Sequence, residues 1–337
     1  MTRPTTCTAL CTLALACAAP LATAQEADPK VQHEAEQKAV VAPAEPVDDA
    51  ALAPPPPDEE PAGGAQFSVG ARSRFTFSAD VQGTDADVQV LHSGLNIGMR
   101  QRLDDRFAIS ADLGFEYSYY DFSGGPVVDG VSDPFSDLYS LGGLVTLSYA
   151  VNDQWSIFGT GFLGVAGESG ADVSDSFLGG GAFGATWRSS DWFQISFGLA
   201  VRSQLEDSAL FTPLINFSWR LSETMRLESR SLPQGGGLGL TWELDKSSEF
   251  TLFGGVEYRQ WRLDGGQGEL RDGVVRDLRV PIGAAMLWRL SPNLSLEVEG
   301  GGIVYQEYEF LDSTGRRIED LNSDIAPFVG VRIEWTF

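Results

Sequence analysis

The sequence predicts an all-β fold, an antiparallel transmembrane β-barrel of about 14 strands, with 12 as the alternative number. Three observations predict it. After Gly64, apolar and polar residues alternate with the period of two that a strand with one apolar face requires. Short polar turns alternate with longer connections rich in Gly and Asp, as in barrels that cross a membrane. Most tryptophans lie close to a short turn.

Residues 1–24 have the pattern of a secretory signal peptide. Arg3 precedes an apolar stretch from Ala9 to Ala19, and Ala22-Thr23-Ala24 matches an A-x-A cleavage site. The apolar stretch is too short for a membrane-spanning helix. All 3 cysteines lie within this segment, so the cleaved chain contains no thiol. Lipidation at Cys17 is the alternative, and it fits the sequence less well.

Residues 25–65 are predicted to be a disordered, acidic, Ala- and Pro-rich linker in the periplasm. The segment has ten acidic residues against two lysines, and Pro54 to Pro57 stand in a row. Such a composition cannot bury enough apolar surface to offset the entropy of ordering. A spacer is the simplest interpretation, with binding to the cell wall or a periplasmic partner as the alternative. The formal net charge of −24 argues against a nucleic-acid partner.

Residues 66–337 are predicted to form the barrel. Six short turns, each between two strand-like runs, define twelve strands. A first strand at about 66–79 and a last at about 322–337 give fourteen. With an even number of strands, the first strand begins and the last strand ends on the short-turn side of the barrel. Twelve strands result if Met225–Leu232 and Gly237–Leu244 do not form a pair. The six turns are Leu103–Phe107, Val151–Trp155, Ser189–Phe193, Leu221–Met225, Leu244–Phe250 and Leu290–Leu294.

The positions of the tryptophans distinguish a membrane barrel from a soluble β-sandwich, in which strands also alternate. Side chains that prefer the membrane interface are expected at one end of every hairpin, whereas core tryptophans have no reason to gather there. Of the 8 tryptophans only Trp261 is remote from a short turn or the C-terminus. The pattern therefore predicts a location in the bacterial outer membrane. The tryptophans of the predicted ring are Trp155, Trp187, Trp192, Trp219, Trp242, Trp288 and Trp335.

The C-terminus resembles that of outer-membrane β-barrel proteins, and the resemblance covers residues 66–337. Ile333, Trp335 and Phe337 match the terminal aromatic signal by which such chains are recognised for insertion. The resemblance implies three partners: outer-membrane lipid, lipopolysaccharide and the outer-membrane assembly machinery. Three short stretches also look like an uncharacterised barrel family of unknown function, which implies no substrate or site. They are Leu232–Gly237, Trp288–Pro292 and Ala326–Gly330.

Residues suited to catalysis are scarce, and we expect neither an enzyme nor a cofactor. His92 is the one histidine outside the linker, and its neighbour Ser93 points to the opposite face of the strand. A nucleophile on another strand remains compatible with the sequence, but an ordinary polar residue in the lumen is the expected role of His92.

No metal site is expected either. Carboxylates in two long connections offer oxygen ligands for Ca²⁺, and bridging of lipopolysaccharide through divalent cations is the alternative to simple solvation. Their spacing matches no calcium-binding loop. These carboxylates are Asp264, Asp272, Asp277, Asp312, Glu319, Asp320 and Asp324.

Charged residues of both signs are predicted to line the pore. Alternation places on the inner face Arg226, Glu228, Arg230, Glu243, Glu257, Arg259, Glu297 and Glu299. Such a lining would form a constriction for polar solutes, and the alternative is that the charges pair and fill the lumen. The sequence thus predicts a porin-like channel for passive diffusion of small polar solutes, or else a closed structural or adhesion barrel. Arg72 and Arg74 are expected beside Glu334, sealing the first strand to the last.

Overall fold

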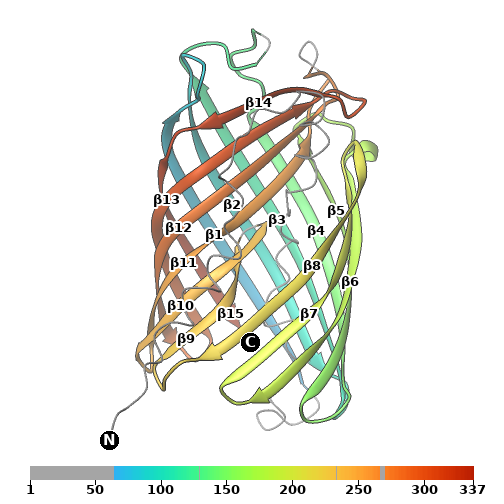
Figure 1. Cartoon of the computed structure of the whole chain (residues 1–337), viewed down its shortest axis with the longest axis vertical. Coiled ribbons are helices and arrows are strands. Elements are labelled where there is room, and N and C mark those ends of the chain that lie inside the picture. Colours follow the sequence, from blue (N-terminus) through green and yellow to red (C-terminus); the bar gives the residue numbers. More distant parts are fainter. Residues whose placement is uncertain (1–63, 129, 233, 266–269) are drawn as a thin grey trace, which may run out of the picture. The chain divides into compact units, whose positions relative to one another are not determined.

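A computed structural model describes residues 64–337 except 129, 233 and 266–269. The predicted signal peptide, and the linker as far as residue 63, lie outside the described residues. Figure 1 shows the strands wrapped into a barrel. In chain order the elements are β1 (Ala65–Asp80), β2 (Asp87–Arg102), β3 (Phe107–Ser123), β4 (Asp137–Ala150), β5 (Trp155–Glu168), a short 3-10 helix η1 (Val173–Asp175), β6 (Phe177–Ser190), β7 (Phe193–Gln204), β8 (Asp207–Arg220), β9 (Met225–Leu232), β10 (Gly235–Asp245), β11 (Ser248–Arg262), β12 (Val274–Ser291), β13 (Leu294–Leu311), β14 (Arg317–Ser323) and β15 (Ala326–Thr336).

The strands form one antiparallel sheet that closes on itself. Neighbours in sequence are neighbours in the sheet from β1 to β13, and β1 pairs with β15 to complete the ring. β14 and β15 both pair with β13, along Gln306–Leu311 and Leu294–Ile303 respectively, so they are two parts of one interrupted strand. The barrel therefore has 14 strands, which confirms the predicted fold. The alternative of twelve is wrong, because β9 and β10 pair along eight residue positions.

The six predicted short turns all join consecutive strands at one end of the barrel. The connections on the other side are not all longer, since only two residues separate β7 from β8 and β9 from β10. The last residue returns to the first strand at the short-turn end, where Phe67 and Phe337 exchange backbone hydrogen bonds of 2.8 and 2.9 Å. In the part of the chain that the structure describes, no helix is both long and apolar enough to cross a membrane.

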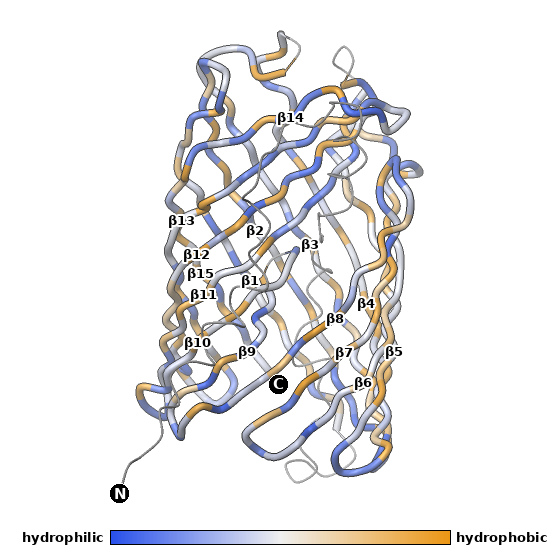
Figure 2. Tube along the Cα trace, in the orientation of Figure 1, coloured by the Kyte–Doolittle hydropathy of each residue, from blue (hydrophilic) through white to orange (hydrophobic). Residues whose placement is uncertain are grey.

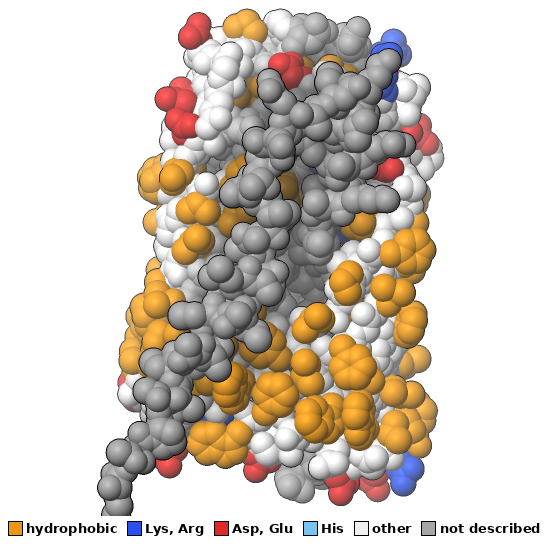
Figure 3. Space-filling model, viewed as in Figure 1, with side chains coloured by type: hydrophobic (Ala, Val, Ile, Leu, Met, Phe, Trp, Pro, Cys, Tyr) orange, Lys and Arg blue, Asp and Glu red, His pale blue; other side chains and the backbone are white. Residues whose placement is uncertain are grey.

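The outer face of the wall is apolar. Alternation along each strand places large aliphatic and aromatic side chains outward, and Figure 2 shows apolar and polar positions succeeding one another along the strands. Phe183, Phe211 and Ile215 are each about two thirds exposed, which a water-soluble sheet would avoid. Figure 3 shows apolar side chains over the wall and acidic ones at both ends of the barrel. The surface thus matches a belt in contact with lipid.

Apolar side chains fill the half of the barrel nearer the long connections. We call this cluster the long-loop plug. Its centre is a group of packed rings, with Tyr120 and Phe135 centroids 4.8 Å apart and Phe122 and Phe135 centroids 5.2 Å apart. Trp261 and Phe310 pack in the same cluster and are almost completely buried. Its side chains come from β2 to β6, from β11 to β14 and from the connections above them, so opposite walls meet across the lumen.

The hydrogen-bonded wall is nearly interrupted between β8 and β9. Only Ser218–Arg220 pair with Arg226–Glu228, so the rest of β8 has no strand partner on that side among the described residues. β11 leaves β10 after Glu257 and meets β5 in parallel at Arg262. We call the resulting gap in strand pairing, between the upper part of β8 and β11, the ladder break (Figure 1).

One facing prediction is wrong as a consequence. Alternation predicts that Tyr258 faces lipid, but its side chain is buried against β7, where the Arg202 guanidinium lies 5.3 Å from its ring centroid. The upper part of β11 turns toward β5, so the outward face of this segment is covered by the inner face of β7. The alternation of apolar and polar residues within β11 contains no information about where β11 separates from β10.

Candidate functional site

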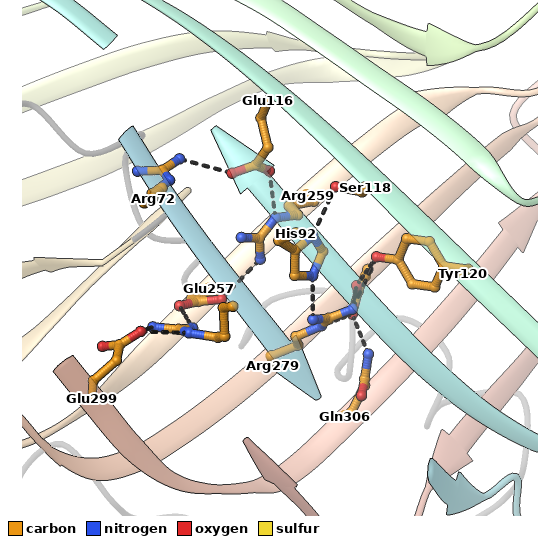
Figure 4. Close-up of polar contacts among 12 residues, drawn as sticks. Arg72, His92, Glu116, Ser118, Tyr120, Glu257, Arg259, Arg279, Glu299 and Gln306 are labelled. Carbon is orange, nitrogen blue, oxygen red and sulfur yellow. Dashed lines mark hydrogen bonds and ion pairs between the residues drawn. The ribbon is translucent and has the colours of Figure 1, made fainter. Parts of the chain in front are cut away.

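Halfway along the lumen, four arginines and four carboxylates form the central charge network (Figure 4). Alternation in each strand brings them to the inner face, and the barrel is narrow enough for side chains from opposite walls to meet. Because the charges balance, each buried ion has a counter-ion, which offsets the cost of removing it from water. The members are Arg72, Arg74, Arg259, Arg279, Glu116, Glu257, Glu299 and Asp277.

Glu257 lies at the centre of this network and has no exposed surface. It accepts hydrogen bonds from Arg74 Nη1 at 2.5 Å and from Arg259 Nη1 at 2.8 Å. Arg259 Nε also donates to Glu116 Oε1 at 2.9 Å, while Arg74 pairs with Glu299 at 2.8 Å. These contacts join β1, β3, β11 and β13 across the lumen. They hold four segments of the wall at fixed separation.

The expected contact of Arg72 and Arg74 with Glu334 is wrong. Arg72 donates to Glu116 of β3 at 2.7 Å, and Arg74 reaches Glu257 and Glu299. In the β1–β15 pairing Arg72 lies opposite Arg332, so the nearest inward residue of the last strand is another cation. Both arginines consequently turn away from the seam and into the lumen.

Arg279 connects the central charge network to a second set of polar groups around His92 (Figure 4). It pairs with Asp277 at 2.5 Å, donates to the Tyr120 hydroxyl at 2.9 Å and donates to His92 Nε2. Because Nε2 accepts, the proton of a neutral His92 is on Nδ1, which donates to Ser118 Oγ at 2.7 Å. Ser118 is therefore a cross-strand neighbour, but His92 in this tautomer cannot take its proton.

The eight predicted pore-lining residues all have ion pairs on the inner face, in three places. Glu257, Arg259 and Glu299 belong to the central charge network. Arg230 pairs with Glu297 at 2.8 Å. The remaining three form a cluster nearer the short turns, in which Arg226 contacts Glu228 at 2.9 Å, Glu243 at 3.4 Å and a residue that the sequence did not single out, Glu249, at 2.8 Å.

Two further members of the central charge network, Asp277 and Arg279, were missed from the sequence because Asp277 was placed in a long connection. Asp277 was grouped with the acids of a long connection, but it lies within β12, is fully buried and binds Arg279, so it is not a loop ligand for Ca²⁺. Asp277 and Arg279 are two residues apart, and that spacing in a strand was the signal that both face the lumen. Among the described residues no group of three or more His, Cys, Asp and Glu is arranged to hold a metal ion.

A cavity of about 240 Å³ adjoins the central charge network and extends to the ladder break. Arg74, Glu116 and Arg259 form its charged wall, and Phe162, Leu178, Leu232 and Trp261 are among its apolar lining. The cavity is thus mixed in character, with fixed charges on one side and aromatic and aliphatic surface on the other. Sites with these properties bind small molecules that have both polar and apolar parts.

Residues 71–336 match the model of a family described as a domain of unknown function, DUF6268. The chain belongs to this family. The predicted resemblance to an uncharacterised barrel family is thereby confirmed. A comparison with curated proteins found no match to this chain.

Several solved structures are similar to this chain. An outer membrane channel from Pseudomonas putida F1 has a TM-score of 0.42 and 14% identity, covering 85% of this chain and 99% of its own. A FadL homologue from Pseudomonas aeruginosa has a TM-score of 0.41 and 12% identity, covering 80% and 89%. The Ralstonia pickettii toluene transporter TbuX has a TM-score of 0.41 and 11% identity, covering 88% and 99%.

Proposed function

We propose that the protein is an outer-membrane channel that passes small polar solutes by passive diffusion. The observation that carries the proposal is the cavity of about 240 Å³ inside a closed, lipid-compatible barrel, with charged groups of both signs along its wall. A purely structural barrel gains nothing from a polar cavity in its interior, since buried charges stabilise less than apolar packing would. Outer-membrane lipid, lipopolysaccharide and the assembly machinery are the partners this location implies.

The path of the solute depends on which parts of the lumen are filled by side chains. The long-loop plug occupies the lumen above the central charge network, whereas the cluster around Arg226 is partly exposed at the short-turn side. A polar solute in the cavity therefore leaves downward past Arg226, and its passage from the other side requires part of the long-loop plug to move. Leu232 and Tyr258 line the cavity at the ladder break. The ladder break is the part of the wall with the fewest backbone hydrogen bonds to separate.

A closed structural or adhesion barrel is the second candidate, and one observation favours it. The long-loop plug and the central charge network together bring side chains from opposite walls into contact across the upper lumen. The acidic long connections would then contact a partner at the cell surface.

Conductance across a planar lipid bilayer distinguishes the two candidates. A channel shows discrete steps. Arg226→Ala removes the cation that Glu228, Glu243 and Glu249 share, and Glu249 alone of these three keeps a further arginine among the described residues, Arg289, so the pore should shift toward cation selectivity. Arg317→Ala is the matched control, because Arg317 binds Glu309 and Asp320 at the far end of the barrel. Absence of steps at every salt concentration would establish the closed barrel instead, and Arg226→Ala would then affect stability alone.

A further inference from the structure

Arg202 is a buried cation without a counter-ion. Its side chain lies on the inner face of β7 and is 7% exposed. Neither Nε nor Nη2 has a hydrogen-bond partner among the described residues, and no described carboxylate pairs with it. Its guanidinium lies over the Tyr258 ring, 5.3 Å from the centroid. A buried guanidinium in this state costs free energy that an anion would recover.

A second unsatisfied donor lies on the same side of β11. Gln260 follows Tyr258 by two residues and therefore shares its face, and its Oε1 accepts from the Leu205 backbone N–H at 3.2 Å. This contact fixes the amide, yet Nε2 has no partner among the described residues. Arg202 and Gln260 both line the cavity, as does Arg259, whose Nη2 is also without a partner. These three residues thus line one cavity, and each has an N–H group without a partner among the described residues.

The carboxylates nearest to this group are already engaged by other arginines. Arg276 binds Asp207 at 3.1 Å and Glu309 at 2.9 Å, and Arg262 binds Glu206. Arg276 itself has an unpartnered Nε beside this region. Each of these three carboxylates is thus bound by Arg276 or Arg262, and among the described residues none of them pairs with Arg202.

Part of the cavity lining is apolar. Phe162, Leu178, Leu232 and Trp261 provide aromatic and aliphatic surface there. An inorganic anion would leave this surface facing water, and a neutral apolar molecule would leave the cation unpaired. A molecule that has one negative group and an apolar body satisfies both walls.

We propose that the cavity binds a small organic anion, with its carboxylate on Arg202 and Gln260 and its apolar body against Phe162 and Trp261. This site rests on the proposed function, because it names the class of solute that the channel passes. The bidentate geometry of a guanidinium suits a carboxylate better than a single point charge would. Benzoate is a suitable probe, since benzamide has nearly the same shape and no charge.

The experiment is calorimetric titration of the full chain, folded in detergent, with benzoate and with benzamide. We expect benzoate to bind at least tenfold more tightly than benzamide. Arg202→Gln should reduce benzoate affinity to the level of benzamide. Gln260→Glu should do the same while keeping the acceptor for Leu205, because it places a carboxylate on the face of β11 that Arg202 covers. Heat-modifiable migration on a gel verifies that each variant is folded.

Arg188→Gln is the matched control. Arg188 lies on β6, next to β7, and its guanidinium binds Gln194 outside the cavity. Its loss should leave benzoate affinity unchanged. Equal binding of benzoate and benzamide to the unaltered protein, or an unaltered benzoate affinity in either cavity variant, would overturn the proposed site. A fall in affinity for Arg188→Gln as large as that for Arg202→Gln would also overturn it.

The outcomes separate this site from the proposed function. Benzoate binding that depends on Arg202, in a protein that shows no bilayer conductance, would reject the channel and retain the site. Conductance with equal affinity for benzoate and benzamide would reject the site and retain the channel.

Discussion

At the scale of single residues, the lumen is organised by Glu257. One of its oxygens binds Arg259 of the same strand and the other binds Arg74 of β1, a contact that only the closed barrel makes. Removing one member of a buried ion pair leaves the other charge without compensation, which costs more than the pair itself contributes. Removing one charged member of the network should therefore destabilise the barrel more than replacing all its members with well-packed apolar residues would.

Glu257→Ala should lower the free energy of unfolding by about 3–5 kcal/mol, because it leaves Arg74 and Arg259 partly unpaired in the lumen. Denaturant unfolding in lipid vesicles, followed by tryptophan fluorescence, measures the change. Glu334→Ala is the control, since Glu334 binds only the partly exposed Arg332, and a change below about 1 kcal/mol is expected. Similar losses for the two variants would show that the buried network does not stabilise the barrel.

At the scale of strands, inner glycines determine how closely β5, β6 and β7 approach. A Cβ built on Gly184 would lie 2.4 Å from the Phe197 carbonyl oxygen and 2.6 Å from the Phe158 ring. Phe158 is the residue opposite Gly184 in the β5–β6 pairing, so its ring covers the glycine from inside the lumen. The missing side chain at position 184 provides the space that this ring occupies.

Gly184→Ala should therefore destabilise the barrel, by about 1–3 kcal/mol, because the new methyl group overlaps backbone that cannot move independently. Gly159→Ala, on the facing strand, is the matched control: its Cβ would meet nothing within 4 Å, and replacing a strand glycine there should be neutral or stabilising. Thermal unfolding of both variants in the same detergent tests the prediction. It fails if Gly184→Ala melts at or above the temperature of the unaltered protein.

The strands were predictable from the sequence because alternation and turn composition are local properties. β9 and β10 illustrate this, since two short apolar-polar runs around one turn predict their pairing. They were also the pair on which the alternative of twelve strands depended, because both runs are short. The inward facing of Glu257 and Arg259 was predictable for the same reason. Their partners were not, because Arg74 and Glu116 lie on other walls of the barrel, and sequence spacing contains no information about which residues meet across a lumen.

Arg202 shows a second limit. Its inward position on β7 follows from alternation, but its lack of a counter-ion depends on β11 leaving β10 and covering the inner face of β7. The same departure misled the prediction for Tyr258. No pattern within either strand signals it, because it follows from β9 and β10 being shorter than the strands around them.

At the scale of the whole molecule, closure depends on the last residue. Phe337 exchanges backbone hydrogen bonds with Phe67, and the two rings stack with centroids 6.0 Å apart. Trp335 lies 5.3 Å from the Phe337 ring. The proposed insertion signal of Ile333, Trp335 and Phe337 thus coincides with the seam at which the first and last strands meet. Recognition by the assembly machinery and closure of the barrel would then use the same outward face.

Phe337→Ala should slow assembly several-fold, because it removes the terminal ring that the proposed signal presents while leaving the backbone bonds to Phe67 possible. Phe211→Ala is the control: that ring is equally outward but lies in the middle of β8. The measurement is the fraction of newly made chain that migrates as the heat-modifiable form in the outer-membrane fraction, followed over time. If Phe211→Ala delays assembly as much as Phe337→Ala does, the effect comes from loss of apolar surface in general, and the three terminal residues are not a signal.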